Sequence, residues 1–214
     1  MTRYHINRRN RTTRDRLVLT ILLAAVAAMA VVAAVFMLKA AGPPLERFGP
    51  APQFAFTDQN HRSFSREDLR GQVWLADFMF TRCQGICPIL ALRMKSFQDR
   101  FADRKGWRIV SFSVDPEHDR PDTLAAYAAR QGADPERWVF LTGDKREIFG
   151  VITDGFRLAV EEGAGTSAEP TLHSPRIVLV DAEGEMRGFY DALDDASMTR
   201  LAADLEGLLR RGGA

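Results

Sequence analysis

Two cysteines carry the most specific chemistry in this sequence. Cys83 and Cys87 are the only cysteines among 214 residues, and they lie four positions apart. An apolar run over residues 73–80 leads into them, and Pro88 follows directly. Two thiolates held close together can exchange a disulfide or hold a soft metal ion. The pair therefore indicates redox or metal-binding chemistry, and its spacing alone does not choose between the two.

A helix is expected directly after the cysteines. Proline suits the first position of a helix because its missing N–H would be unpaired there, so Pro88 is expected to begin the helix. The apolar residues that follow recur at helical spacing and form one stripe; they are Leu90, Met94, Phe97 and Phe101. This arrangement places Cys87 near the N-cap and Cys83 in the preceding loop. The free amides and the positive end of the helix dipole are expected to favour the thiolate form of both sulfurs.

The composition excludes several classes of protein. Apolar residues make up 46% of the chain and charged residues 27%, which is typical of a globular protein. Residues 1–39 carry seven basic residues and one acid, whereas the other 175 carry 22 basic and 27 acidic residues. A mildly acidic domain lacks the electrostatic footprint of a nucleic-acid-binding protein. Two cysteines are too few for a disulfide scaffold or a four-thiolate zinc site, and no organic cofactor is expected.

The N-terminal region reads as a membrane anchor. A basic segment, residues 1–16, precedes an uncharged run of 22 residues at 17–38, long enough to span a hydrocarbon core of about 30 Å. The arginines before the run predict that the N-terminus lies in the cytoplasm and the domain in the periplasm or extracytoplasmic space. A cleaved signal peptide is the alternative, although its apolar region is usually only ~7–15 residues. A proline-rich linker at 39–52 would then connect the anchor to a domain over residues 53–214.

The rest of the chain alternates between strand and helix patterns. The expected strands cover residues 54–58, 73–80, 107–114, 138–141, 177–180 and 186–190. One helix is expected to begin at Pro88, and two more are expected over residues 121–131 and 145–152. A C-terminal helix capped by Ser197 is expected last. A loop rich in Gly, Ala and Glu is expected over 161–171. This order indicates a mixed α/β sheet with helices on both faces, and a redox or metal motif at a strand-to-helix turn is the thioredoxin arrangement.

Four motifs in this order resemble the Sco/SenC family. They are Phe80-Thr81-x-Cys83-x-x-Ile86-Cys87-Pro88, Ser113-Val114-Asp115-Pro116-x-x-Asp119, Leu141-Thr142-Gly143, and His173-Ser174 followed by an apolar strand and Asp181-x-x-Gly184. Members of that family are membrane-anchored copper proteins of thioredoxin fold that help to assemble the copper centre of cytochrome c oxidase. The resemblance covers roughly residues 50–210.

The resemblance implies a copper site with three ligands. Cys83, Cys87 and His173 would hold one copper ion, since copper(I) prefers thiolate and copper(II) accepts imidazole. Asp115, at the end of a central strand, would be an outer-shell group or weak ligand, or else part of a structural Asp-Pro turn. The implied partners are the copper-bearing subunit of cytochrome c oxidase and a periplasmic copper donor.

The remaining histidines and two methionines near the cysteines have simpler interpretations than metal ligation. His118 lies close to Asp115, but a contact with metal is the less favoured interpretation. His5 and His61 are most simply surface residues. Met79 and Met94 are expected to pack in the core, as methionines at strand or helix-stripe spacing usually do.

A thiol–disulfide reductase is the main alternative to a copper chaperone. Such an enzyme would keep the copper-ligand cysteines of a partner protein reduced. Asp77-Phe78, six positions before Cys83, resembles the lead-in of thioredoxin, in which a buried aspartate helps to move the proton of the cysteines. Asp77 is therefore a possible proton acceptor for the pair Cys83 and Cys87. A peroxidase of the peroxiredoxin type fits the spacing poorly.

Overall fold

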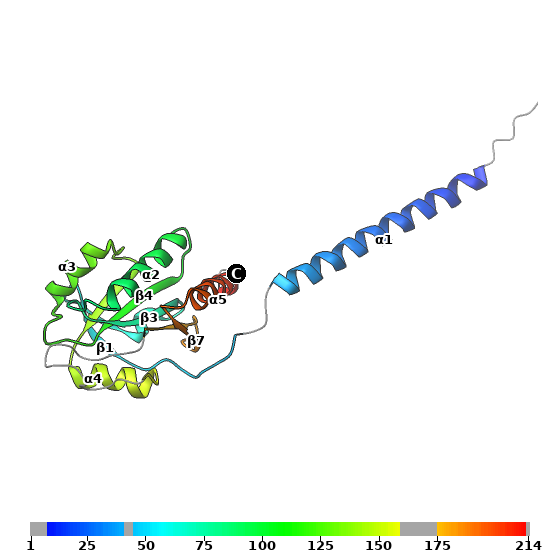
Figure 1. Ribbon diagram of the computed structural model, residues 1–214. Helices are drawn as coiled ribbons and strands as arrows, with labels where there is room; N and C mark the ends of the chain where they lie inside the picture. The colour runs from blue at the N-terminus through cyan, green and yellow to red at the C-terminus, as the bar shows by residue number, and fades with distance from the viewer. Residues whose placement is uncertain (1–7, 41–44, 159–174, 213–214) are drawn as a thin grey trace, which may run out of the picture. The chain divides into compact units, whose positions relative to one another are not determined.

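The computed structural model describes the backbone of residues 8–40, 45–158 and 175–212. The chain forms two units, Met1–Pro44 and Leu45–Ala214. The first contains helix α1 (Arg8–Ala40), and the second contains the sheet and all the other helices (Figure 1).

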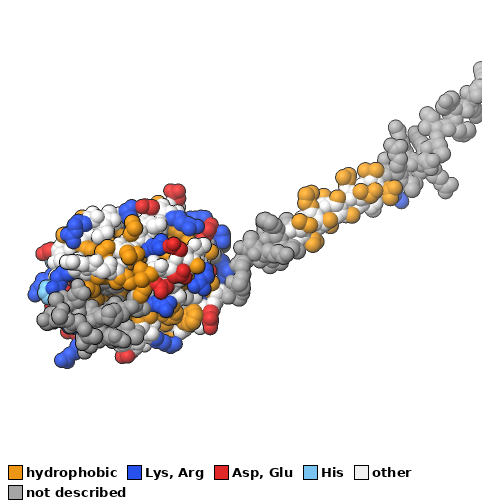
Figure 2. Space-filling view, in the orientation of Figure 1, with side chains coloured by type: hydrophobic (Ala, Val, Ile, Leu, Met, Phe, Trp, Pro, Cys, Tyr) orange, Lys and Arg blue, Asp and Glu red, His pale blue; other side chains and the backbone are white. Residues whose placement is uncertain are grey.

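Helix α1 is longer than the expected span of residues 17–38. Its side chains are described over residues 16–32, and all of them are exposed. Large apolar side chains make up much of this surface, as Figure 2 shows in orange; they are Leu17, Val18, Leu19, Ile21, Leu22, Leu23, Val26, Met29, Val31 and Val32. Within the described part of the chain, no helix combines the length and the hydropathy that a membrane crossing requires.

The second unit is built on a seven-stranded sheet in the order β2-β1-β5-β4-β3-β6-β7. The strands are β1 (Ala55–Asp58), β2 (Ser63–Ser65), β3 (Val73–Met79), β4 (Trp107–Ser113), β5 (Trp138–Thr142), β6 (Arg176–Val180) and β7 (Met186–Asp191). β3, β4 and β5 are parallel neighbours, whereas β6, β7, β1 and β2 pair antiparallel. Because β3 and β4 are parallel, their carboxyl ends meet at the same edge of the sheet.

Helices cover both faces of this sheet. They are α2 (Cys87–Arg100), α3 (Pro121–Gln131), α4 (Lys145–Gly150), which continues into η2 (Val151–Gly155), and α5 (Asp195–Gly212), with a short 3-10 turn η1 (Arg66–Leu69). α2 and α3 lie on one face and α4 on the other (Figure 1). The expected mixed α/β thioredoxin-like fold is therefore confirmed.

Strand β3 shows why Asp77 faces the cysteine side. Side chains alternate between the two faces of a strand. Trp74 and Phe78 point to the face where their rings contact Phe156, which follows η2, at centroid distances of 6.1 and 5.3 Å. Asp77 has the opposite parity and points to the face that carries α2. All seven residues of β3 are buried, as expected for a central strand covered on both sides.

Residues 45–52 of the expected linker pack on the domain. Phe48 N donates to Met186 O at 3.0 Å, and Ala51 N donates to Gly184 O at 2.9 Å. The buried Arg187 donates to the carbonyl oxygen of Leu45 at 2.6 Å and pairs with Asp181 at 2.8 Å. The folded unit accordingly begins at residue 45.

Two helix starts differ from the expected ones. α2 begins at Cys87, so Pro88 occupies its second position, where a missing N–H is equally harmless. α5 begins at Asp195, and the Asp194 carboxylate accepts the amides of Ala196 and Ser197. The prediction that Ser197 caps this helix is wrong, because an aspartate three residues earlier already supplies the cap. The expected loop at 161–171 lies outside the described residues.

Candidate dithiol and metal centre

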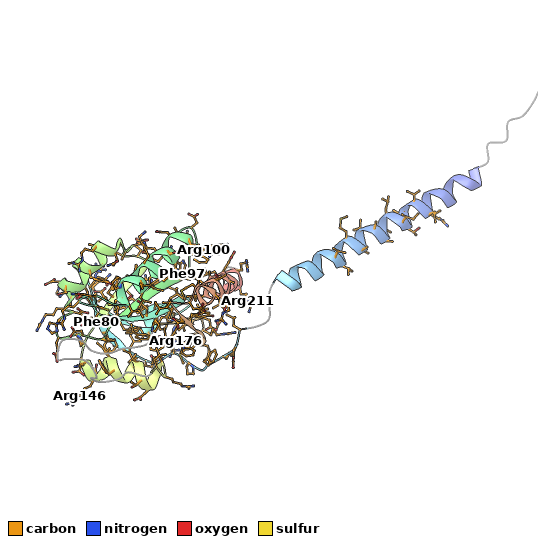
Figure 3. The ribbon with its side chains drawn as sticks, in the orientation of Figure 1. Phe80, Phe97, Arg100, Arg146, Arg176 and Arg211 are labelled. Atoms are coloured by element: carbon orange, nitrogen blue, oxygen red, sulfur yellow. The ribbon has the colours of Figure 1, made fainter. Side chains whose placement is uncertain are left out.

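The two cysteines lie where β3 ends and α2 begins. Cys83 N donates to Phe80 O at 3.3 Å, which closes a turn after the strand. Cys87 N, an amide in the first turn of α2, donates to Cys83 Sγ at 3.4 Å. Both cysteines are free thiols. Figure 3 shows Phe80 at this end of the domain, with Phe97 and Arg100 towards the far end of α2.

The two thiols differ in exposure. Cys87 is 3% exposed, whereas Cys83 is half-buried and its neighbours Gln84 and Gly85 are exposed. Cys83 is therefore the more accessible of the two sulfurs.

Burial reverses the expected ionisation of Cys87. Loss of solvent raises the pKa of the Cys87 thiol well above its ordinary value, and its hydrogen bond with Cys83 raises it further. A hydrogen bond from the Phe80 backbone opposes these effects without overcoming them. The prediction that the helix start favours thiolate is thus wrong for Cys87, since a first-turn position does not compensate for desolvation. The Cys87 N–H does point at the Cys83 sulfur, as expected for an amide at the helix start.

Asp77 lies in the core on the cysteine side of the sheet. Its carboxyl is 1% exposed and accepts a hydrogen bond from Ser111 Oγ at 2.5 Å; Trp138 Nε1 in turn donates to Ser111 Oγ at 2.8 Å. Burial raises the pKa of Asp77 to about 7, although the Ser111 hydrogen bond partly offsets this rise. The charge of Asp77 also contributes to the raised pKa of Cys87, so the two groups are close enough to interact. The sequence did not indicate Ser111 or Trp138.

Asp115 contacts the cysteine loop through its neighbours. Arg82, which directly precedes Cys83, donates from Nη2 and Nε to Asp115 Oδ2 at 2.6 and 3.0 Å. His118 Nδ1 lies 2.9 Å from Asp115 Oδ1. Both carboxylate oxygens are therefore engaged by side chains, which favours an outer-shell position over direct metal ligation.

Asp119 has a role in this region that no sequence pattern indicates. It is fully buried and accepts hydrogen bonds from Thr81 and Ser113. Its place in the motif that begins at Ser113 was visible in the sequence, but a spacing of 38 residues gives no sign of a contact with Thr81.

His61, Met79 and Met94 lie where the simpler interpretations place them. His61 is exposed and lies 2.8 Å from Asp122. Met79 and Met94 are buried in the core. His5 and His173 lie outside the described residues. Among the described residues, no group of three or more His, Cys, Asp and Glu side chains could hold a metal ion. The described part of the centre is thus a pair of soft sulfur donors, which suits a soft ion such as copper(I) better than a hard cation.

The fold and this site together define the class of the protein. A parallel β3–β4–β5 core with a Cys-x-x-x-Cys pair at the start of α2 is a thioredoxin-like dithiol domain. The sequence profile of the SCO1/SenC family matches residues 44–210. The chain belongs to this family, and the expected family membership is confirmed.

Relatives include proteins known with copper. The SCO1 protein homolog of Bacillus subtilis is 34% identical over 155 residues, which are 72% of this chain and 79% of the homolog. The structure of BsSco, described as a member of the Sco family of cytochrome c oxidase assembly proteins with a disulfide switch, is 30% identical with a TM-score of 0.68; the match covers 78% of this chain and 98% of that one. Bradyrhizobium japonicum ScoI, solved with copper bound, is 28% identical with a TM-score of 0.59 and coverages of 74% and 99%.

Proposed function

We propose that this protein binds one copper ion through Cys83, Cys87 and His173 and delivers or prepares it for the copper centre of a cytochrome c oxidase. The observation that carries the proposal is the pair of free thiols at the start of α2, where the Cys87 N–H donates to Cys83 Sγ. Membership of a family with copper-bound members supports copper as the metal. The copper-bearing oxidase subunit and a periplasmic copper donor are the proposed partners. Transfer would proceed by ligand exchange, which is binding chemistry without turnover.

The three ligands have different tasks. The half-buried Cys83 is accessible to an incoming copper ion, and the buried Cys87 completes a two-thiolate site that suits copper(I). His173 adds the imidazole that copper(II) accepts. Because the pKa of Cys87 is raised, copper binding must displace its proton. Copper affinity is therefore expected to fall as the pH is lowered.

Anaerobic copper titration of the reduced domain lacking residues 1–42 tests the proposal. We expect uptake of one equivalent of copper and, for the copper(II) form, thiolate-to-metal charge-transfer absorption. Absence of stoichiometric binding by the fully reduced protein would refute the copper proposal.

Asp115→Asn is expected to weaken copper binding by roughly tenfold and to leave its stoichiometry at one, because outer-shell partners typically contribute 10–100-fold to metal affinity. The substitution weakens the contact with Arg82, the neighbour of Cys83. Competition with a chelator of known affinity measures the change. Asp122→Asn, which affects an exposed pair with His61, is the matched control. Loss of all copper binding in the Asp115 variant would instead make this residue a ligand.

We further propose that the domain is tethered to the cytoplasmic membrane by a single span over residues 17–38. The uncharged 22-residue run and the arginines before it support this topology. The large apolar side chains of α1 between Leu17 and Val32 are all exposed, which suits a lipid-facing surface. The N-terminus would lie in the cytoplasm and the domain in the periplasm or extracytoplasmic space.

A fusion experiment tests this topology. A reporter that is active only outside the cytoplasm, fused after Ala214, should be active, and the protein should stay in the membrane fraction after a high-salt wash. A soluble product with a new N-terminus near residue 40 would show that the segment is a cleaved signal peptide.

A thiol–disulfide reductase is the second candidate function. Its specific support is the buried Asp77, whose charge interacts with Cys87 and whose pKa lies near neutrality. Such a carboxylate could accept the Cys87 proton while the pair reduces a disulfide in a partner protein.

A further inference from the structure

We propose that Asp119 is the positioning residue of the cysteine pair: it fixes the loop before Cys83 and thereby sets the separation of Cys83 from Cys87. The inference deepens the proposed function, because the same two thiols would hold the copper. The effect of Asp119 on the separation of the two thiols also exists in the metal-free protein, where it can be measured without copper.

The first observation is the set of contacts that Asp119 makes. Its carboxylate accepts the Thr81 backbone N–H at 3.0 Å, the Thr81 hydroxyl at 2.5 Å and the Ser113 hydroxyl at 2.6 Å. The three donors come from two segments, the loop after β3 and the end of β4. Asp119 therefore joins the loops that follow two neighbouring parallel strands.

The second observation is the burial of this carboxylate. Asp119 is 0% exposed, and among the described residues it has no basic side chain as an ion-pair partner. Burying a carboxylate is costly unless hydrogen bonds compensate for the lost water. The three donors supply this compensation, so they are held to the carboxylate and not exchanged for solvent. We call Asp119 together with its donors Thr81 and Ser113 the Asp119 clamp. This buried clamp restrains the Thr81 backbone more firmly than an exposed contact would.

A short series of contacts connects the clamp to the sulfur atoms. Thr81 and Arg82 are the central residues of the turn that Cys83 N closes on Phe80 O at 3.3 Å. Cys83 Sγ then accepts the Cys87 N–H at 3.4 Å. Beyond Cys83, Gln84 and Gly85 are exposed, and the described contacts include no hydrogen bond of the Gln84 side chain. The loop before Cys83 is thus restrained by the exposed Arg82 side chain on Asp115 and by Thr81 on the fully buried Asp119, and the second of these contacts is the one that solvent does not reach.

Loss of the Asp119 clamp should lower the effective concentration of the Cys83 thiol near the Cys87 thiol. This quantity is measured by equilibrating the metal-free full-length protein in detergent with glutathione. In that reaction the protein dithiol gives two electrons and two protons to one glutathione disulfide, and the products are the protein disulfide and two glutathione thiols. We expect Asp119→Ala to lower the equilibrium constant roughly tenfold, which makes the reduction potential of the pair about 30 mV less negative.

Substitutions at Thr81 test the same contact from its other side. Thr81→Val removes the hydroxyl donor at similar volume and should lower the equilibrium constant roughly threefold, whereas Thr81→Ser should retain the wild-type value. Adding Thr81→Val to Asp119→Ala should cause little further loss, because both changes break one interaction. Amide hydrogen exchange in a peptide covering residues 80–87 should become faster in Asp119→Ala and in Thr81→Val. If Asp119→Ala does not fold, Thr81→Val decides the test.

Asp181→Asn is the matched control for a general loss of stability. Asp181 is also a buried acid with hydrogen bonds and an ion pair to Arg187, but it lies in the β6–β7 turn. If the Asp119 and Thr81 variants shift the glutathione equilibrium no more than Asp181→Asn does, the inference is overturned. The outcome is independent of copper: failure of wild-type protein to bind copper would refute the proposed function and leave this measurement unaffected.

Discussion

Replacement of Cys83 or Cys87 by alanine is expected to abolish copper binding and the thiolate-to-copper charge-transfer band. The Cys87 N–H contacts Cys83 Sγ, and the two cysteines supply the only soft donors at the start of α2 among the described residues. A single remaining thiolate cannot form the two-coordinate site that copper(I) prefers. Anaerobic titration of the reduced variants, with bound copper counted after gel filtration, measures this loss.

Replacement of His173 is expected to separate the two oxidation states. Two thiolates alone can hold copper(I) linearly, so His173→Ala should retain some copper(I) binding but lose stable copper(II) binding. His61→Ala is the control, since His61 lies on the surface beside Asp122. Unchanged copper(II) spectra in His173→Ala would remove His173 from the site, and loss of copper(II) in both variants would make the effect nonspecific.

Asp77→Asn is expected to slow reduction of a protein disulfide tenfold or more if the reductase function operates, on the order of the lower end of general acid–base assistance. Burial gives Asp77 a pKa of about 7, and a carboxylate near neutrality can accept the proton of the buried Cys87 thiol. Copper affinity at neutral pH should change little, because metal binding itself deprotonates the thiols. Stopped-flow measurement of disulfide reduction gives the rate.

Ser111→Ala is the matched control for Asp77→Asn. It removes the hydrogen bond that Ser111 Oγ donates to Asp77 but leaves the carboxyl in place. The Ser111 variant should therefore retain most of the exchange rate. If the wild-type protein exchanges with no protein disulfide, the reductase interpretation fails and copper delivery remains as the function.

The same carboxyl makes a prediction for stability. The pKa of Asp77 rises from 3.8 to about 7 on folding, so the folded protein binds more protons than the unfolded chain between these values. The contribution of Asp77 to stability is therefore fully present below pH 4 and is lost as the pH rises towards 7. Since each unit of pKa shift corresponds to about 1.4 kcal/mol, Asp77→Asn should raise the free energy of unfolding at pH 8 by a few kcal/mol. This gain in the free energy of unfolding should be smaller at pH 5. Urea unfolding of the wild-type protein and the variant at pH 5 and pH 8 measures the difference. An equal gain at the two pH values would contradict the raised pKa of Asp77.

The sequence by itself determined the elements that carry the site. Period-2 and helical apolar patterns are local properties of the chain, so the strand before Cys83, the stripe that follows Cys87 and the alternation of strands and helices were predictable. The order of motifs identified the family, and the copper prediction agrees with relatives known with copper. Local rules also misplaced the starts of α2 and α5. For α5, both Ser197 and Asp194 can cap a helix, and only the folded chain shows that Asp194 does so.

Only the tertiary structure decided the environment of the thiols. The contacts between Asp77 and Ser111 and between Thr81 and Asp119 join residues 34 and 38 positions apart. They form because β3 and β4 are parallel neighbours, and strand pairing is not encoded by any local pattern. Burial of Cys87 has the same origin: neighbouring elements of the fold remove the water around its sulfur, and this desolvation outweighs its position in the first turn of α2.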